Sequence, residues 1–214
     1  KSVFAIEEDR LGNIWVGYWK KGIAKITFDK QSETYTSVNY QNEFNNTNSL
    51  SNNFVRDILE DSNGDIWVGT IRGLNKLKED AAGKIAFTSY LNDPKNKNSL
   101  SNNYVLDIFQ ASDGHLYVGT FGGGLNQIEI SNNTLNFKQY TTNEGLPSDV
   151  VYQIKEDNQG NIWMLHVREI SKLNPTTGEI TYFENQDGIN VSEFKDTAML
   201  FSTSGMMLCG GVNG

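Results

Sequence analysis

Three short acidic clusters are the residues of this chain whose types could support acid–base chemistry. They are Glu7-Glu8-Asp9, Glu60-Asp61 and Glu156-Asp157. Two carboxylates can act as general acid and general base when they face the same reacting bond. These clusters recur at the same turn of a repeated unit, so we expect them to lie far apart and to serve turn formation and solubility. No catalytic residue is predicted.

Metal-binding and nucleophilic patterns are equally sparse. Asp61-x-Asn63-x-Asp65 starts like a calcium loop, but its glycine is at the fourth position and Arg72 stands where the twelfth-position glutamate is needed. His115 and His166 have no partners spaced as metal ligands or as a catalytic triad. The single cysteine, Cys209, cannot form an internal disulfide. We therefore predict no metal site and no cofactor.

The better candidates for binding are residues in turns that differ from one copy of the repeat to the next. Aromatic planes and cations on a shallow face are suited to stacking against sugars and hydrogen bonding to them. Ordinary sequence drift in loops is the competing interpretation for any single position. The candidate ligand-binding residues are Tyr18, Trp19, Lys20, Arg72, Phe121, His166 and Arg168.

These turns belong to a sequence repeat. The sequence from Asn48 to Leu77 recurs, with few changes, from Asn98 onward. Five glycines, each two residues before an apolar pair, mark the register at intervals of 52, 50, 46 and 45 residues: Gly12, Gly64, Gly114, Gly160 and Gly205. This spacing is close to that of a four-stranded propeller blade.

Each repeat divides into four short segments with strand character. In the second copy they are residues 54–60, 65–69, 74–77 and 85–91, separated by turn residues such as Asn63-Gly64. No segment keeps a helical period for three turns without a glycine or an asparagine cluster. A bulky residue recurs in the second strand and is expected to fill the space between blades: Trp15, Trp67, Tyr117 and Trp163.

The predicted fold class is all-β, with propeller blades of four antiparallel strands. We expect about four and a half blades in one partial domain over residues 1–214, with boundaries near 2–48, 54–98, 104–145, 150–188 and 194–214. So few blades predict either an open arc or an arc completed by another copy. Because residue 1 is not methionine and a strand starts at once, the chain is expected to be part of a longer protein.

Composition narrows the possible partners. The chain has 214 residues, a net charge of −8 and a pI near 4.8. Nucleic-acid binding requires a basic stripe, and the longest basic run is Lys20-Lys21, so no nucleic-acid contact is predicted. The sequence also contains no apolar run of the roughly 18 residues that a membrane span needs.

The repeat resembles the two-component regulator propeller repeat. The resemblance rests on Asn-Ser-Leu-Ser-Asn-Asn-x-Val, then Glu-Asp-x-x-Gly-x-Ile-Trp-Val-Gly-Thr, then Gly-Leu-Asn-Lys-Leu, and it covers nearly the whole chain. The third copy departs from it with Gln110-Ala111, and the fourth with Met164-Leu165-His166 and Glu169. The last segment, residues 187–214, is similar to the closing blade before an Ig-like stalk domain in such proteins.

That resemblance implies a function. Such repeats fill the periplasmic sensors of hybrid two-component histidine kinases in gut Bacteroides, which detect oligosaccharides and control polysaccharide-utilisation genes. It implies a periplasmic fragment without catalytic activity, a homodimeric parent, and the remaining blades and an Ig-like stalk as partners. Two alternatives stay open: a scaffold for dimerisation or partner docking that binds no ligand, and a propeller polysaccharide lyase or hydrolase. The lyase or hydrolase would need a carboxylate pair or a His/Tyr cluster, which these turns do not supply.

Overall fold

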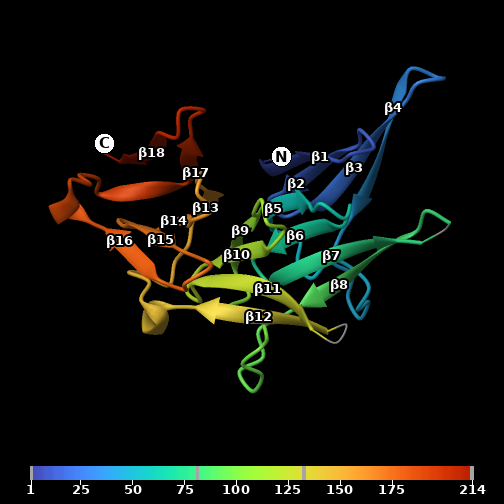
Figure 1. The fold of residues 1–214 in the computed structure, drawn as a ribbon. Helices are drawn as coiled ribbons and strands as arrows, with labels where there is room; N and C mark the ends of the chain where they lie inside the picture. Colours follow the sequence, from blue (N-terminus) through green and yellow to red (C-terminus); the bar gives the residue numbers. More distant parts are fainter. Residues whose placement is uncertain (1, 81, 132–133, 213–214) are drawn as a thin grey trace. The chain divides into compact units, whose positions relative to one another are not determined.

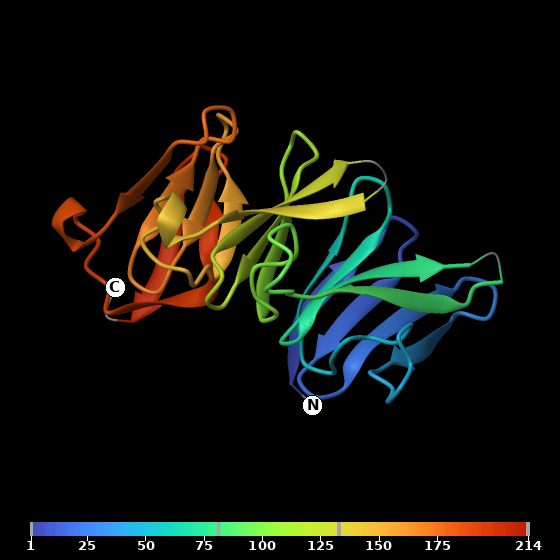
Figure 2. The same cartoon turned by 90° about the horizontal axis from the view of Figure 1, so that it is seen from below.

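Short antiparallel sheets and the loops between them build most of the described chain, as a computed structural model shows for residues 2–80, 82–131 and 134–212 (Figure 1). Within these ranges four sheets have four strands each, and a fifth has two. In every four-stranded sheet the strands are neighbours in chain order, which is the connectivity of a propeller blade (Figures 1 and 2). The all-β prediction is confirmed.

The strands of each sheet have the following bounds. Blade 1 contains β1 (Val3–Glu8), β2 (Ile14–Tyr18), β3 (Gly22–Asp29) and β4 (Thr34–Tyr40). Blade 2 contains β5 (Val55–Glu60), β6 (Ile66–Thr70), β7 (Gly73–Glu79) and β8 (Ile85–Tyr90). Blade 3 contains β9 (Val105–Gln110), β10 (Leu116–Thr120), β11 (Leu125–Ser131) and β12 (Thr134–Tyr140). Blade 4 contains β13 (Gln153–Glu156), β14 (Ile162–Leu165), β15 (Ile170–Leu173) and β16 (Ile180–Phe183), and β17 (Glu193–Phe201) pairs with β18 (Met207–Val212).

Positive-φ glycines form the turn between the first and second strands of each unit. Gly64 has φ 87° and Gly114 has φ 89°, and the turn glycines of the other copies lie close to these values. Glycine adopts this left-handed region without the steric penalty of a Cβ. The interval between these glycines therefore reports the blade period.

The chain divides into two compact units. The first comprises residues 1–92 and 103–105 and contains blades 1 and 2. The second comprises residues 93–102 and 106–214 and contains blades 3 and 4 and the two-stranded sheet. Each loop that joins one blade to the next packs with the following blade, since the backbone N–H of Phe87 donates to Asn48 and that of Phe137 donates to Asn98. The division into blades within one domain stays a prediction, as does the way the ring is completed.

Large side chains from the second strand fill the layers between neighbouring blades. Trp15 is 1% exposed and shares a cluster with Val55 and Ile58 of blade 2. Tyr117 is fully buried and shares a cluster with Ile154 of blade 4. Trp163 packs against the cluster that joins blade 4 to the two-stranded sheet. Each ring buried in this way contributes a few kcal/mol, on the order of 2–3, to the stability of the stack.

Two short 3₁₀ helices were not predicted from the sequence. They span Thr142–Glu144 and Asn185–Asp187, and each ends at a glycine in the left-handed region. At the first, the Thr141 hydroxyl accepts from the backbone N–H of Asn143, and the Glu144 side chain accepts from the backbone N–H of Thr141. A capped 3₁₀ helix therefore precedes blade 4, whereas an asparagine-rich loop precedes blades 2 and 3.

Candidate ligand-binding site

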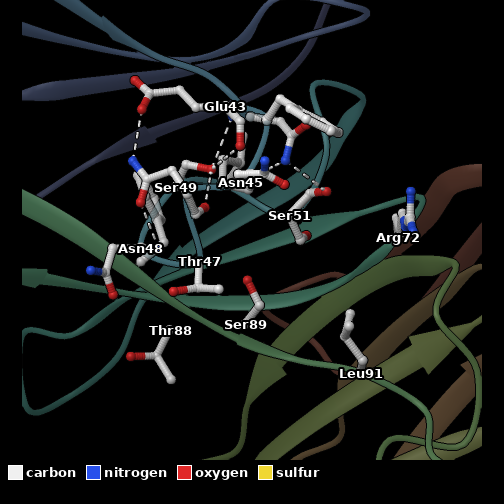
Figure 3. Close-up of a pocket in the computed structure, with 15 residues that line it drawn as sticks. Glu43, Asn45, Thr47, Asn48, Ser49, Ser51, Arg72, Thr88, Ser89 and Leu91 are labelled. Atoms are coloured by element: carbon white, nitrogen blue, oxygen red, sulfur yellow. Dashed lines mark hydrogen bonds between the residues drawn. The ribbon is translucent and has the colours of Figure 1, made fainter.

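An open cavity of about 660 Å³ lies within the first unit, beside the loop that joins β4 to β5 (Figure 3). Three parts of the chain form it: the loop itself, the β6–β7 turn with Arg72, and the end of β8. In Figure 3, the side chains of Thr47, Ser89 and Leu91 extend into the same space. The lining residues are Asn42, Glu43, Phe44, Asn45, Asn46, Thr47, Asn48, Ser49, Leu50, Ser51, Arg72, Phe87, Thr88, Ser89 and Leu91.

Hydrogen bonds fix the loop in one conformation. The amide nitrogen of Asn42 donates to the Leu50 carbonyl at 2.8 Å, and the backbone N–H of Glu43 donates to Ser49 Oγ at 3.0 Å. Leu50 is fully buried and holds the centre of the loop against the core. The loop is thus preorganised, which reduces the entropy that ligand binding would have to overcome.

A buried polar group ties this loop to blade 2. Asn75 is fully buried, and its Oδ1 accepts from the backbone N–H of Ser51 at 2.9 Å. Its amide nitrogen donates to Ser51 Oγ at 2.9 Å, and the Ser89 hydroxyl donates to its Oδ1 at 3.0 Å. Buried polar groups are stable only when they are satisfied in this way. The wall of the cavity therefore depends on Asn75.

The cavity combines three kinds of contact surface. Amide and hydroxyl groups lie beside apolar surface, and Phe44 is 94% exposed at the loop. The Arg72 side chain is exposed, and its backbone N–H is held by Thr70 Oγ1 at 3.1 Å. An exposed ring, a cationic fork and many hydroxyl and amide groups are the functional groups that recognise polyhydroxylated ligands.

Two of the predicted site residues, Trp19 and Lys20, take part in an aromatic cluster of the first unit. Trp19 stacks on Phe4 at a centroid distance of 5.0 Å and meets Phe54 edge-on at 4.6 Å. Lys20 lies over the Phe54 ring at 5.8 Å and has a positive φ of 75°. Tyr18 ends β2 and is half-buried. The structure thus brings Trp19 and Lys20 together at the Phe54 ring, whereas Arg72 lines the cavity.

The other three predicted residues lie in the second unit. Phe121 is 49% exposed and forms a backbone bridge with Val150. Arg168 is exposed, and its Nε donates to the Ser192 carbonyl at 3.1 Å. Both side chains are accessible for a ligand.

His166 has different surroundings from those its turn position suggested. It is fully buried, with Nδ1 at 2.8 Å from the Val150 carbonyl oxygen and Nε2 at 2.7 Å from Ser171 Oγ. Burial lowers the pKa of His166 to about 4, so the ring is neutral near pH 7. His166 stands at the repeat position that Thr70 and Thr120 occupy in blades 2 and 3, and both of its ring nitrogens contact protein atoms. In this structure His166 ties β14 to the preceding loop and does not face a ligand.

The acidic clusters accept hydrogen bonds that join neighbouring blades and stabilise turns. Glu60 accepts from the backbone N–H of Arg10 at 2.7 Å and from its Nε at 2.8 Å. In the second unit, Glu156 accepts from the backbone N–H and the hydroxyl of Ser112, both at 2.7 Å. Each carboxylate therefore ties the turn of one blade to the first strand of the next.

The aspartate that follows has a second role, which the sequence did not reveal. Asp61 accepts from the backbone N–H groups of Asn63 and Asp65 and from Trp67 Nε1 at 2.9 Å. Asp9 with Trp15 and Asp157 with Trp163 repeat this arrangement. Blade 3 has Ala111 and Tyr117 at these two positions, so the carboxylate and the indole are replaced together.

These carboxylates are therefore occupied by turn amides and indoles. Across the described ranges there is no group of three or more His, Cys, Asp or Glu side chains placed to hold a metal ion. Among the same residues, no helix has the length and apolar character of a membrane span.

The predicted site residues came from turns within blades, so they missed this cavity, which lies beside a loop between blades. Leu50, Leu100 and Leu146 in such loops are at most 4% exposed. A comparison of the first two loops would have pointed to the site. Their scaffolds are nearly identical, but Phe44 in one corresponds to Pro94 in the other.

Repeated four-stranded sheets, packed through a recurring aromatic ring, define a β-propeller-type fold. The sequence model of the family described as "Two component regulator propeller" matches residues 49–72, 99–122 and 145–167. Three segments of the chain thus match this repeat, and the predicted resemblance is confirmed.

The chain is similar to part of a histidine kinase and to part of a two-component system. The chain is 29% identical to Histidine kinase P4 of Formosa agariphila over 220 residues, which is all of this chain and 15% of that protein. A structure named the extracellular domain of the hybrid two component system BT4673 of B. thetaiotaomicron matches with a TM-score of 0.76 and 25% identity, over 98% of this chain and 28% of that chain. The chain therefore resembles part of the extracellular domain of a two-component system and spans a minor part of both relatives.

Some propellers with the same fold are enzymes. The structure of virginiamycin B lyase from Staphylococcus aureus matches with a TM-score of 0.61 and 15% identity, over 99% of this chain and 70% of that chain. At this identity the likeness concerns the fold alone.

Proposed function

We propose that this chain is a ligand-sensing part of a hybrid two-component sensor histidine kinase, located in the periplasm, and that it detects oligosaccharides to control polysaccharide-utilisation genes. The observation that carries the proposal is the match to three regulator-propeller repeats together with the likeness to the BT4673 extracellular domain over 98% of this chain. The chain itself has no catalytic role in this proposal; the kinase chemistry belongs to another part of the parent protein.

Accessible aromatic and cationic side chains support saccharide binding. Trp19 with Lys20 and Arg72 in the first unit, and Phe121 with Arg168 in the second, offer ring faces and hydrogen-bond donors. We propose that these residues contribute to ligand binding. His166 contributes indirectly, by positioning the β14–β15 turn.

Further sheets of the parent are the expected partners of blade 1. Ile6 is 66% exposed, whereas its equivalents Ile58 and Ile154 are at most 4% exposed because a neighbouring blade covers them. A surface patterned for burial supports packing against remaining blades. The Ig-like stalk and the homodimer are part of the same proposal, and ligand binding would act by favouring one arrangement of the dimer.

Isothermal titration calorimetry of the whole chain against neutral and uronate-bearing oligosaccharides tests the sensing function. We expect saturable binding to at least one oligosaccharide, and at least tenfold weaker binding when Trp19 or Arg72 is replaced by alanine. Absence of binding across the panel would refute sensing by this chain. Concentration-dependent dimerisation in analytical ultracentrifugation without any binding would support the scaffold alternative, and turnover of a panel member would support the enzyme alternative.

A further inference from the structure

We propose that the cavity beside the β4–β5 loop is a binding subsite for a short oligosaccharide, with Phe44 as the stacking platform and Arg72 as the hydrogen-bonding fork. The proposal rests on the sensing function above and names where the ligand is held. A volume of about 660 Å³ lies within the range of about 300–1,000 Å³ that is common for small-molecule sites.

The molecule contains a second copy of the same loop scaffold, which separates structural residues from recognition residues. In the second loop, the backbone N–H of Asp93 donates to Ser99 Oγ at 2.9 Å, as that of Glu43 donates to Ser49 Oγ. The backbone N–H of Ser101 donates to Asn126 Oδ1 at 2.9 Å, as that of Ser51 does to Asn75 Oδ1. These shared bonds hold the loops, so they do not explain the residues that differ.

One difference controls whether the space beside the loop is occupied. In blade 3, the Gln139 amide nitrogen reaches the Ser99 carbonyl at 2.8 Å and so bridges the outer strand and the loop. The equivalent residue in blade 2 is Ser89, because Asn75 pairs with Ser89 as Asn126 pairs with Gln139. The shorter Ser89 side chain turns back to Asn75, at 3.0 Å. The exchange of glutamine for serine leaves room for a ligand in blade 2.

The remaining differences add recognition groups at the same place. Phe44 replaces Pro94, and Arg72 replaces Gly122, so blade 2 gains a ring and a guanidinium where blade 3 has neither. Phe44 is 94% exposed, although burying a ring of that size would stabilise the fold by about 2 kcal/mol. Hydrogen bonds of Asn42 and Glu43 hold the loop, so the scaffold keeps the ring in water.

Sugar chemistry fits this set of groups. Sugar rings present C–H faces that pack on an aromatic ring and hydroxyl groups that both donate and accept hydrogen bonds. Thr47, Thr88 and Ser89 supply hydroxyls, and Arg72 supplies donors in a planar fork. The Glu43 carboxylate is engaged by the Asn46 amide nitrogen at 2.7 Å.

The decisive experiment exchanges Ser89 and Gln139 separately. Titration calorimetry of the whole chain uses the tightest binder from a panel of neutral and uronate-bearing tri- and tetrasaccharides. S89Q fills the cavity with the side chain that blade 3 already tolerates, so we expect at least tenfold weaker binding at an unchanged melting temperature. Q139S is the matched control and should bind within twofold of the unchanged protein. F44P and R72G copy the other blade 3 residues and should each weaken binding at least fivefold.

The outcomes separate this inference from the sensing function. Binding that S89Q, F44P and R72G all leave intact, but that W19A abolishes, would overturn the cavity assignment and leave the sensing function in place. Absence of binding by the unchanged protein to every member of the panel would refute both. Loss of binding in Q139S to the same extent as in S89Q would also overturn the assignment, because the second loop would then matter equally.

Discussion

Removing the Asp61 carboxylate by D61A tests the physical basis of the blade. Asp61 is 3% exposed and accepts two turn amides and the Trp67 indole N–H, with Trp67 itself 2% exposed. A buried donor left without a partner costs about 1–3 kcal/mol, and exposed turn amides cost less because water can replace the carboxylate. We expect D61A to lower the free energy of unfolding by about 2–4 kcal/mol.

Asp80 offers a matched control for this substitution. It also accepts two turn amides, from Ala82 and Lys84 at 2.9 Å each, but it is exposed and bonds no indole. D80A is therefore expected to cost under about 1 kcal/mol. Urea denaturation followed by circular dichroism measures both variants. The Asp61 carboxylate is expected to stabilise the fold mainly through its bond to the indole. Equal losses of unfolding free energy in D61A and D80A would refute this, because both variants lose only the turn amides in common.

Three further predictions concern other elements. Gly119→Ala would place a Cβ 2.8 Å from the Val151 carbonyl oxygen, so we expect a loss of about 1–3 kcal/mol in urea denaturation, whereas a variant as stable as the parent would contradict this close approach. His166 has a folded pKa of about 4 against 6.5 when unfolded, so its contribution is complete above pH 6.5 and is lost as the pH falls toward 4, by about 3 kcal/mol. H166T, which restores the threonine of blades 2 and 3, should flatten this part of the stability–pH profile, and an unchanged slope would refute the assignment. Asn75→Ala removes the buried group that ties the β4–β5 loop to blade 2, so hydrogen exchange should quicken at Ser51, while unchanged protection there would show that the loop is held by other contacts.

Most of the architecture could be predicted because it depends on local and repeated signals. The glycine period gave the blade length, since each of those glycines occupies a turn that needs positive φ. Strand boundaries agree within one or two residues, as for 54–60 against Val55–Glu60. The burial of Trp15 and Tyr117 followed from their recurrence in register, since blades that stack must cover the same position each time.

The candidate site was harder to predict. Turn positions were correct indicators of exposure for Arg72 and Phe121, but His166 lies in a fully buried polar pair with Ser171. Apart from Arg72, the residues that line the cavity were not among the predicted site residues. Ser89 bonds to Asn75, whereas its equivalent Gln139 reaches the loop at Ser99, and no local pattern specifies either contact.

The sequence by itself determined the repeat, the short strands and the apolar positions that face the core, because hydrophobic periodicity and turn chemistry act over a few residues. Only the tertiary structure decided which polar groups meet. Trp67 and Asp61 are six residues apart, but Ser51 and Asn75 are 24 apart and Gln139 and Ser99 are 40 apart. Such contacts depend on how a whole blade closes around its loop, and it is this closure that creates the cavity.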